Sequence, residues 1–469
     1  MILKYLAIGR AILLGSVLFL TGNAAARSPN IIYILADDLG YGDLSCYGQD
    51  TLRTPHLDRL AAEGVRFTRH YAGSTVCAPS RCVLMTGLHT GHARIRGNGP
   101  GRLKEEDVTF ATRLREAGYH SGAFGKWGIG NPPPLDDPNR HGFDEFYGYV
   151  NMFHAHNFYP EFLVHNGERV PLRNRLYPEW KAQQTPEREG RGVAEVAVDY
   201  APALIRDTML DYIRNHRDEP FFVYYALNIP HANNEAGGED RIGRNGMRVP
   251  DWGDFAENEW PAQEKGFASM IQAIDSDVGA VLALLEELEL DQETLVMFSS
   301  DNGPHQEGGH RVDFFDSNGA LRGKKRDLYE GGVRVPFIAR WPGTIPAGRV
   351  EDTISGFQDI FPTVLELAGV PNETSTDGIS LAPALLGRPN QGKRDYLYWE
   401  FFEQGGKRAA LMGNWKAVQL DLQRNPDGPI ALFNLEDDPG EAKNLAGERP
   451  ELVQRARRIF QTAHTEIEP

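Results

Sequence analysis

Residues 30–36 read Asn-Ile-Ile-Tyr-Ile-Leu-Ala, and the acidic pair Asp37-Asp38 follows at once. An uninterrupted apolar run of this length, rich in β-branched residues, is typical of a strand buried on both faces of a parallel sheet. Similar runs follow along the chain at 121–125, 221–227, 294–299 and 335–340. These runs predict a buried and mostly parallel sheet.

Amphipathic helices are expected between these strands. Apolar residues recur with a helical period at 55–63, 108–117, 203–215 and 265–288. Strands that alternate with helices form a sheet covered by helices on both faces. We therefore predict an α/β fold with a large, mostly parallel mixed sheet sandwiched between helices.

The N-terminus has the pattern of a secretory signal peptide over residues 1–26. Lys4 and Arg10 form a charged start, residues 11–20 are apolar, and Ala24 to Ala26 offer small residues for cleavage. The alternative is an uncleaved anchor, but the run is shorter than the ~20 residues that a spanning helix needs. We expect an exported protein, periplasmic or secreted, with no membrane span after cleavage.

The C-terminal part of the chain differs from the rest in composition and in its pattern of predicted elements. Residues 383–393 are rich in Pro, Gly and Asn and look like a connection. Short strand-like runs follow at 395–401 and 409–419, and an amphipathic helix is expected at 450–464. This pattern predicts a large catalytic domain over 27–387 and a small α+β subdomain over 388–469 with antiparallel strands.

The charge balance excludes one class of partner. The chain has 65 acidic and 49 basic residues, a net charge of −16. Nucleic acid is not expected as a partner, because phosphate binding requires a basic face. An anionic substrate is repelled at long range, so any anion site must be a local basic pocket.

Polar residues follow four of the predicted strands. They are Asp37-Asp38, Lys126, His231 and Asp301-Asn302. Ligands of open α/β sheets bind beyond the carboxyl ends of the strands, so these groups are expected at one edge. An acidic pair alone is usually a turn or a helix cap. Three carboxylates and an amide together indicate a calcium or magnesium site rather than a zinc site.

A second motif is Cys77-Ala78-Pro79-Ser80-Arg81, followed by Thr86-Gly87. Pro79 is predicted as the first residue of a helix, which places Cys77 just before a helix N-terminus that favours an anion. A buried structural cysteine is the simpler reading. A Cys-phosphatase loop needs a longer spacing than the three residues between Cys77 and Arg81. The other two cysteines, Cys46 and Cys82, form either a disulfide or two buried thiols.

The Cys77 motif resembles the maturation signature of formylglycine-dependent sulfatases, arylsulfatase-like members of the alkaline phosphatase superfamily. The resemblance extends to four more blocks, in order: Asp37 to Gly42, Gly118 to Trp127, Ser300 to Gly303 and Tyr329 to Arg334. It covers most of the chain, and it implies an alkaline phosphatase-like fold and a sulfuric ester hydrolase that needs a formylglycine-generating maturation enzyme.

The resemblance also implies a role for each matching residue. Asp37, Asp38, Asp301 and Asn302 would ligate one calcium ion together with the modified Cys77, and Arg81 would steady the formylglycine hydrate. Lys126 and Lys325 would hold sulfate oxygens, with Lys324 as the alternative to Lys325. His231 would protonate the leaving alcohol. A second hydroxyl on the hydrate would then release sulfate from the covalent ester.

One position departs from the family pattern. Members commonly have His two residues after the lysine of the Lys-Trp block, and here that position is Gly128. His305 and His310 lie after the acidic pair at 301–302, and His310 is our predicted replacement for the missing base.

The substrate is expected to be a sulfated sugar or polysaccharide fragment. The loops at 130–200 and 232–264 follow strand ends and should wall the pocket, with His154 and His156 as substrate-binding candidates. His89, His92, Arg94 and Arg96 are further candidates for binding anionic groups. Two other functions stay open: a phosphatase or phosphodiesterase of the same superfamily, and a non-catalytic protein that binds sulfated glycans.

Overall fold

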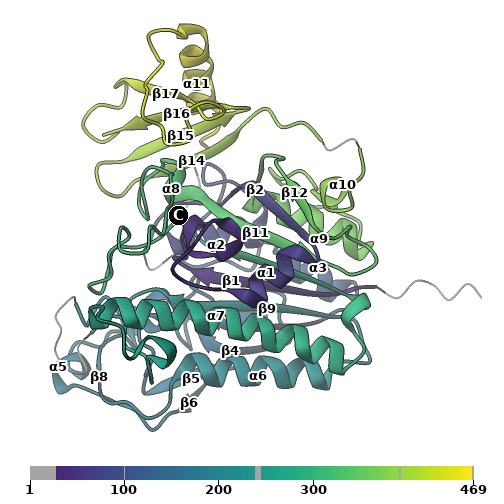
Figure 1. Cartoon of the computed structure of the whole chain (residues 1–469), viewed down its shortest axis with the longest axis vertical. Coiled ribbons are helices and arrows are strands. Elements are labelled where there is room, and N and C mark those ends of the chain that lie inside the picture. Colours follow the sequence, from purple (N-terminus) through teal and green to yellow (C-terminus); the bar gives the residue numbers. More distant parts are fainter. Residues whose placement is uncertain (1–27, 100, 238–244, 390–391, 467–469) are drawn as a thin grey trace, which may run out of the picture.

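The computed structural model describes residues 28–99, 101–237, 245–389 and 392–466. The predicted signal peptide, residues 1–26, lies outside the described residues. Within them, the fold has a large sheet with helices on both faces and a small antiparallel sheet at the C-terminal end (Figure 1). The predicted α/β class is confirmed.

The large sheet has 11 strands in the part of the chain that the structure describes. Its order is β12-β2-β11-β10-β1-β9-β3-β4-β5-β6, with β13 beside β2. The bounds are β1 Asn30–Asp37, β2 Val65–Tyr71, β3 His120–Lys126, β4 Glu145–Tyr149, β5 Phe162–His165, β6 Glu168–Pro171, β9 Phe221–Pro230, β10 Thr294–Ser300, β11 Arg334–Arg340, β12 Arg349–Glu351 and β13 Ser355–Gly356. A separate short pair is formed by β7 Arg175–Leu176 and β8 Ala194–Val196.

The centre of the sheet is parallel and its margins are mixed. β10, β1, β9, β3 and β4 run parallel to one another, whereas β11 pairs antiparallel with both β10 and β2. β1 is buried along its whole length. Its alternate residues enter opposite core clusters, because successive side chains of a strand point to opposite faces.

Each face of the sheet is covered by its own helices. α1 Pro55–Ala62, α6 Ala201–Asn215 and α7 Ala262–Glu287 pack on the face that includes Ile32 and Ile34. α2 Cys77–Thr86, α3 Phe110–Glu116 and α9 Ile360–Ala368 pack on the face that includes Ile31 and Tyr33. Shorter helices are α4 Met152–Ala155, α5 Pro178–Lys181, α8 Glu330–Val333 and α10 Ala382–Leu385.

α7 is a core helix. It is the one helix within the described ranges that is long and apolar enough to cross a membrane by length and composition. In the fold, 61% of its most apolar window is buried, and the helix packs against β9, α1 and α6. Figure 1 shows α7 and α6 running side by side below the sheet.

The C-terminal subdomain is an antiparallel sheet with one helix, as predicted. Its order is β14-β15-β16-β17, and its elements are β14 Leu397–Phe401, β15 Lys407–Met412, β16 Trp415–Leu420, β17 Ile430–Asn434 and α11 Pro450–Thr462. One sheet face packs against Tyr71 and Val333 of the large domain, and the other is covered by α11.

Two local predictions are wrong. The run at 409–419 is not one strand but a hairpin that turns at Gly413, where φ is +63°, a value that glycine adopts at little cost. The helix after the cysteine motif begins at Cys77 itself, so Pro79 is its third residue rather than its first. Cys46, Cys77 and Cys82 are all free thiols, so Cys46 and Cys82 do not form a disulfide. Cys82 is buried as expected, but Cys46 is only half-buried.

Candidate active site

The carboxyl ends of four neighbouring strands bring the predicted polar groups together. β10, β1, β9 and β3 lie side by side and parallel, so their last residues meet at one edge of the sheet. Register also ties the two acidic pairs to each other, because the Asp301 amide donates to the Ala36 carbonyl at 3.0 Å. The predicted edge site therefore has a direct topological cause.

The two acidic pairs are hydrogen-bonded to each other. Asp38 adopts a φ of +65°, a left-handed conformation that Asp tolerates better than most residues. In this conformation its amide donates to Asp301 Oδ1 at 3.0 Å. Asn302 Nδ2 donates to Asp38 Oδ1 at 2.7 Å. All of these side chains are buried, together with Asp37.

This cluster fits a hard divalent cation. Asp37 Oδ1 and Asn302 Oδ1 are buried oxygens without a hydrogen-bond partner among the described residues. Burial and the nearby charge of Asp37 raise the pKa of Asp301 to about 7, and a bound cation would oppose that shift. Three carboxylates and an amide oxygen are ligands of the kind that calcium prefers. The residues present therefore fit the predicted metal site.

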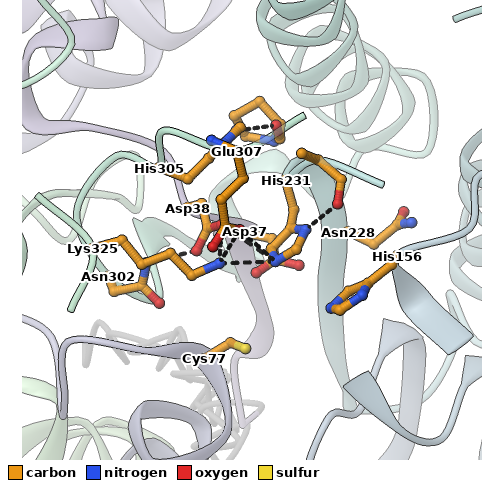
Figure 2. Close-up of polar contacts among 12 residues, drawn as sticks. Asp37, Asp38, Cys77, His156, Asn228, His231, Asn302, His305, Glu307 and Lys325 are labelled. Carbon is orange, nitrogen blue, oxygen red and sulfur yellow. Dashed lines mark hydrogen bonds and ion pairs between the residues drawn. The ribbon is translucent and has the colours of Figure 1, made fainter. Parts of the chain in front are cut away.

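Cys77 lies beside this cluster at the N-terminus of α2 (Figure 2). Its side chain is buried, and burial raises the pKa of its thiol. Lys126, Asp37, Asp301 and Lys325 all act electrostatically on the thiol. Residue 77 thus lies beside the acidic cluster with two lysines near enough to act on its thiol.

Arg81 lies one helical turn after Cys77, on the same helix. Its Nε donates to Asp301 Oδ2 at 2.9 Å, and its Nη1 donates to the Lys126 carbonyl at 2.5 Å. The guanidinium is fully buried and lies 3.7 Å from Asp37 Oδ1. Arg81 thereby fixes α2 against the ends of β10 and β3.

Two lysines reach the acidic cluster from different sides. Lys126 Nζ donates to Asp37 Oδ2 at 2.6 Å. Lys325 Nζ donates to Asp38 Oδ2 at 2.7 Å and to Glu307 Oε2 at 2.8 Å. The alternative Lys324 instead donates to Gln306 Oε1 at an exposed position. The geometry therefore favours Lys325.

His231 lies at the centre of the cluster, as Figure 2 shows. Its Nδ1 lies 2.6 Å from the Ala232 carbonyl, so Nδ1 carries the proton. Its Nε2 lies 3.0 Å from Lys325 Nζ and accepts from that ammonium. Burial and the charge of Lys325 hold the pKa of His231 well below its usual range. The Lys325 ammonium therefore donates a hydrogen bond to a neutral His231 beside the acidic cluster.

Glu307 and His305 are two residues of the site for which the sequence predicted no role in this position. Glu307 joins Lys325 and Arg326 in ion pairs, and its Oε2 lies 3.9 Å from His231 Nε2. His305 Nε2 lies 2.8 Å from the Pro230 carbonyl, while its Nδ1 accepts from the Glu307 amide at 3.1 Å. Both ring nitrogens are thus engaged by backbone. The one feature of the sequence that could have indicated these two residues is their place in the loop directly after Asn302.

His310 is not placed at the nucleophile. Its Nδ1 lies 2.7 Å from Glu264 Oε2, and its ring stacks on Phe267 at 3.8 Å. Both partners belong to α7, so the fold turns this ring toward the helix layer. The placement does not support our prediction that His310 replaces the missing base.

The two histidines predicted to bind substrate differ in position. His156 stacks on His231 with ring centroids 4.7 Å apart and pairs with Glu235. His154 is fully buried, and its Nε2 lies 2.9 Å from the Phe162 carbonyl. The structure therefore brings His156 to the site but not His154.

The four basic residues after α2 are already paired with carboxylates. His92 lies 2.9 Å from Asp377, which His89 also approaches. Arg94 pairs with Asp107, and Arg96 pairs with Glu400. These partners leave little free charge for a substrate anion, in contrast to our prediction.

Gly128 lies next to the side chains of Arg81 and Lys126. Its φ is +77°, and a Cβ added to it would lie 3.1 Å from Arg81 Cδ and 3.6 Å from Lys126 Cε. The backbone here is left-handed and the space is narrow, so a histidine would require local rearrangement. The left-handed backbone and the nearby Arg81 side chain therefore favour glycine over histidine at position 128.

The fold and these groups define a hydrolase of anionic esters, with a basic and acidic cluster at the carboxyl edge of a mixed α/β sheet. The model of the family described as Sulfatase matches residues 29–370, and a model described as N-sulphoglucosamine sulphohydrolase, C-terminal, matches residues 323–462. The chain belongs to the sulfatase family of the alkaline phosphatase superfamily, and it is a sulfuric ester hydrolase.

Curated relatives and solved structures agree with this assignment. The chain is 30% identical to N-acetylgalactosamine-6-sulfatase of Canis lupus familiaris, over 96% of this chain and 88% of the relative. It is 33% identical to arylsulfatase A of Homo sapiens, over 93% and 88%. The crystal structure of Ps i-CgsB in complex with k-i-k-neocarrahexaose is similar with a TM-score of 0.77 and 27% identity, covering 93% of both chains.

Proposed function

We propose that this enzyme removes sulfate from a sulfated sugar, with a formylglycine made from Cys77 as its nucleophile and one calcium ion as its cofactor. The observation that carries the proposal is the position of Cys77, which is buried at a helix N-terminus beside two carboxylates and two lysines. A buried thiol whose pKa is raised is inert, so a thiolate is a poor candidate for the nucleophile. Conversion of Cys77 would remove that obstacle.

The proposed substrate class draws on the relatives. One is named N-acetylgalactosamine-6-sulfatase, and one similar structure holds k-i-k-neocarrahexaose. A Bacteroides thetaiotaomicron structure described in the context of the metabolism of multiple glycosaminoglycans has a TM-score of 0.74 and 27% identity, covering 93% of this chain and 99% of that chain. We take from these names a sulfated sugar unit as the substrate of this chain.

Asp37, Asp38, Asp301 and Asn302 would hold the calcium ion beside residue 77. When bound, the cation would screen the sulfate charge and favour an ionised oxygen on residue 77. Formylglycine would supply a carbon that carries two hydroxyls when hydrated, one to attack sulfur and one to release the sulfate. Arg81 would orient these oxygens through its position on the helix that carries residue 77.

The basic side chains would bind the sulfate and supply a proton. Lys126 and Lys325 would donate to sulfate oxygens, which replace Asp37 and Asp38 as partners once those carboxylates ligate calcium. The negative charge of a sulfate beside His231 would raise the affinity of its Nε2 for a proton. Lys325 Nζ lies 3.0 Å from that atom and could supply the proton. His231 would then donate the proton to the departing sugar oxygen.

The first experiment measures chemistry and modification together. Protein made with a formylglycine-generating enzyme is incubated with a panel of sulfated mono- and disaccharides, and released sulfate is measured. The peptide that contains residue 77 is weighed by mass spectrometry. We expect sulfate release from at least one sugar only in protein with the converted residue. Active protein with an unmodified thiol would refute the formylglycine, and converted protein without any release would favour the non-catalytic glycan-binding alternative.

A phosphatase or phosphodiesterase with two metal ions is disfavoured by the surroundings of Asp38. A second cation would need further ligands near Asp38, where His305 and Glu307 lie. Both nitrogens of His305 are engaged by backbone, and the Lys325 ammonium lies between Asp38 and Glu307. An ammonium there supplies the positive charge that a second metal ion would supply.

Replacing His231 by asparagine is expected to lower kcat for a sugar sulfate by about 10²- to 10⁴-fold, the range for loss of a general acid. An aryl sulfate with an acidic phenol should be much less affected, because its leaving oxygen needs no proton. The measurement compares kcat for the two substrates in both proteins. Equal losses on both would contradict the assigned role of His231. His154→Asn is the control, since His154 is also buried but bonds to a backbone carbonyl away from the cluster.

Removal of calcium is expected to lower stability as well as activity. A cation that binds only the folded state at 100 times its dissociation constant adds about 2.7 kcal/mol to the free energy of unfolding. Thermal unfolding should therefore occur at lower temperature after chelation and recover with added calcium. Asp38→Asn should abolish the calcium-dependent shift, whereas an unchanged melting temperature in chelated wild-type protein would exclude a bound cation.

Export belongs to the same proposal. The charged start, the short apolar run and the small residues before residue 27 motivate it. Sequencing the N-terminus of the protein from its native host would test it: a mature chain that begins near Arg27 is expected, and an intact Met1 in all of the protein would contradict it.

A further inference from the structure

The N-terminus of α2 donates hydrogen bonds to a residue in the loop that follows the helix. The helix begins at Cys77, and the preceding residue, Val76, has no side-chain acceptor for the free amides of the first turn. Asn98 Oδ1 takes this role, because it accepts from the Ala78 amide at 3.2 Å. The same oxygen lies 3.7 Å from Cys77 Sγ and accepts from the thiol.

Asn98 is itself held by the C-terminal subdomain. The backbone N–H of Asn98 donates to Glu403 Oε1 at 2.8 Å. Glu403 follows β14, and the segment before Asn98 is anchored in the same way, since Arg96 donates to Glu400 Oε1 at 3.0 Å and to the Thr465 carbonyl at 2.7 Å. A chain of contacts therefore runs from the C-terminal subdomain through Asn98 to residue 77.

The subdomain supports the opposite side of the site as well. Lys407 on β15 donates to the Arg326 carbonyl at 2.7 Å. Arg326 directly follows Lys325 and has a φ of +77°, a conformation that costs free energy in a non-glycine residue. The C-terminal subdomain thus contacts one residue that binds Cys77 and one residue that directly follows Lys325.

We propose that Asn98 is a positioning residue for the nucleophile, held in place by Glu403 of the C-terminal subdomain. Asn98 Oδ1 accepts a hydrogen bond from one hydroxyl on the carbon of residue 77 and thereby fixes where the other hydroxyl points. This proposal rests on the proposed function, because it concerns the hydrated form of residue 77. It also gives the small subdomain a part in catalysis.

The absence of a side chain at position 128 increases the importance of this contact. A hydrate has two equivalent hydroxyls on a carbon that rotates about one bond, so each group that binds one of them restricts that rotation. With glycine at 128, no side chain from that position restrains the hydroxyls. Asn98 approaches residue 77 from the start of α2, with a fixed backbone and an oxygen that can only accept.

Replacing Asn98 by leucine is expected to lower kcat about tenfold and to leave KM within about twofold, as for the loss of one oriented hydrogen bond. Asn98→Asp keeps the acceptor oxygen, so its kcat should stay near that of the wild type while its added negative charge raises KM for the anionic substrate. Each kcat is calculated from the concentration of protein with a converted residue 77, which is measured by mass spectrometry; KM needs no such correction. A kcat for Asn98→Asp as low as that for Asn98→Leu would overturn the proposal.

A second readout does not depend on turnover. A hydrogen bond to the hydrate favours it over the free aldehyde, so Asn98→Leu should react faster with an aminooxy probe that labels aldehydes. Asn98→Asp should react at the rate of the wild type. Equal labelling rates in all three converted proteins would refute the proposed contact, even if no substrate of the enzyme had been found. Lack of sulfate release by the wild type would instead count against the proposed function.

The role of Glu403 is tested by a double-mutant cycle. Glu403→Leu should reduce kcat in the same direction as Asn98→Leu but less, and the double variant should be no worse than Asn98→Leu alone, because Glu403 acts through Asn98. Effects that multiply in the double variant would show that Glu403 acts elsewhere.

Discussion

Replacing Cys77 by alanine is expected to reduce the rate of sulfate release by roughly 10⁴- to 10⁶-fold, the range seen when a hydrolase loses its covalent nucleophile. The residue lies at the start of α2 beside the acidic cluster. Its thiol donates to Asn98 Oδ1 and lies in the field of two lysines and two aspartates, whose proposed roles are to bind sulfate and calcium. The measurement is sulfate release under saturating substrate, with calcium present.

Cys82→Ala is the matched control for this prediction. Cys82 is a second buried thiol on the same helix, but it packs in the apolar cluster between α2 and the face of the sheet that includes Ile31 and Tyr33, rather than at the edge of the sheet. Its loss should lower the melting temperature slightly and leave kcat near the wild-type value. If both variants lost activity equally, the loss would reflect damage to α2 and not the chemistry of residue 77.

Cys77→Ser would separate attack from release. A serine oxygen can bond to sulfur while the sugar oxygen departs with a proton, but serine has no second hydroxyl to expel the sulfate. We expect no turnover and a residue-77 peptide that retains sulfate after incubation with substrate. A serine variant that turned over many times would contradict the need for formylglycine.

Replacing Lys416 by methionine is expected to lower the free energy of unfolding by about 3–5 kcal/mol, the cost of leaving a buried charge without its partner. Lys416 on β16 is fully buried, and its Nζ lies 2.8 Å from Glu330 Oε1 and 3.5 Å from Glu441 Oε1. Glu330 belongs to α8 in the large domain, where Tyr71 and Arg334 also bind it. The ion pair therefore joins the two parts of the protein. Urea unfolding of wild type and variant gives the difference.

The control for Lys416 is Lys443→Met. Lys443 pairs with Glu448 at 3.3 Å, but the two side chains are 71% and 65% exposed. An exposed pair of this kind contributes little to stability because water and salt screen it. If Lys416→Met and Lys443→Met unfolded at the same urea concentration, the buried network would not be what holds the C-terminal subdomain in place.

Much of the fold followed from the sequence because its central strands are nearly continuous apolar runs. Such runs can only be buried on both faces, and the helices between them require a parallel sheet. β2 and β4 were missed, since β2 mixes buried and half-buried residues and carries charged side chains, and β4 is short. The hairpin of β15 and β16 was also taken as one strand, because its turn consists of only Gly413 and Asn414.

Within the site, the residues next to strand ends were predictable and the loop residues were not. A strand end fixes where the following side chain lies, so the places of Asp37, Lys126 and His231 followed from the order of the chain. The orientation of a loop histidine depends on what packs beside it. Glu264 and Phe267 of α7 hold the ring of His310, and the Phe162 carbonyl holds His154 on the short helix α4. Both rings are therefore bound by partners outside the acidic cluster.

The sequence by itself determined that a buried sheet carries acidic, basic and cysteine groups to one edge, because burial and strand direction are local properties of the chain. Only the tertiary structure decided which distant segments complete the site. Asn98, Glu307 and Glu403 became neighbours of these groups through the packing of loops and of a second subdomain. The contact between Asn98 and Glu403 joins residues 305 positions apart, and the contacts of Asn98 with Cys77 and of Glu307 with Lys325 depend on how loops fold back. Such contacts form only when the chain is folded, so a short sequence motif does not reveal them.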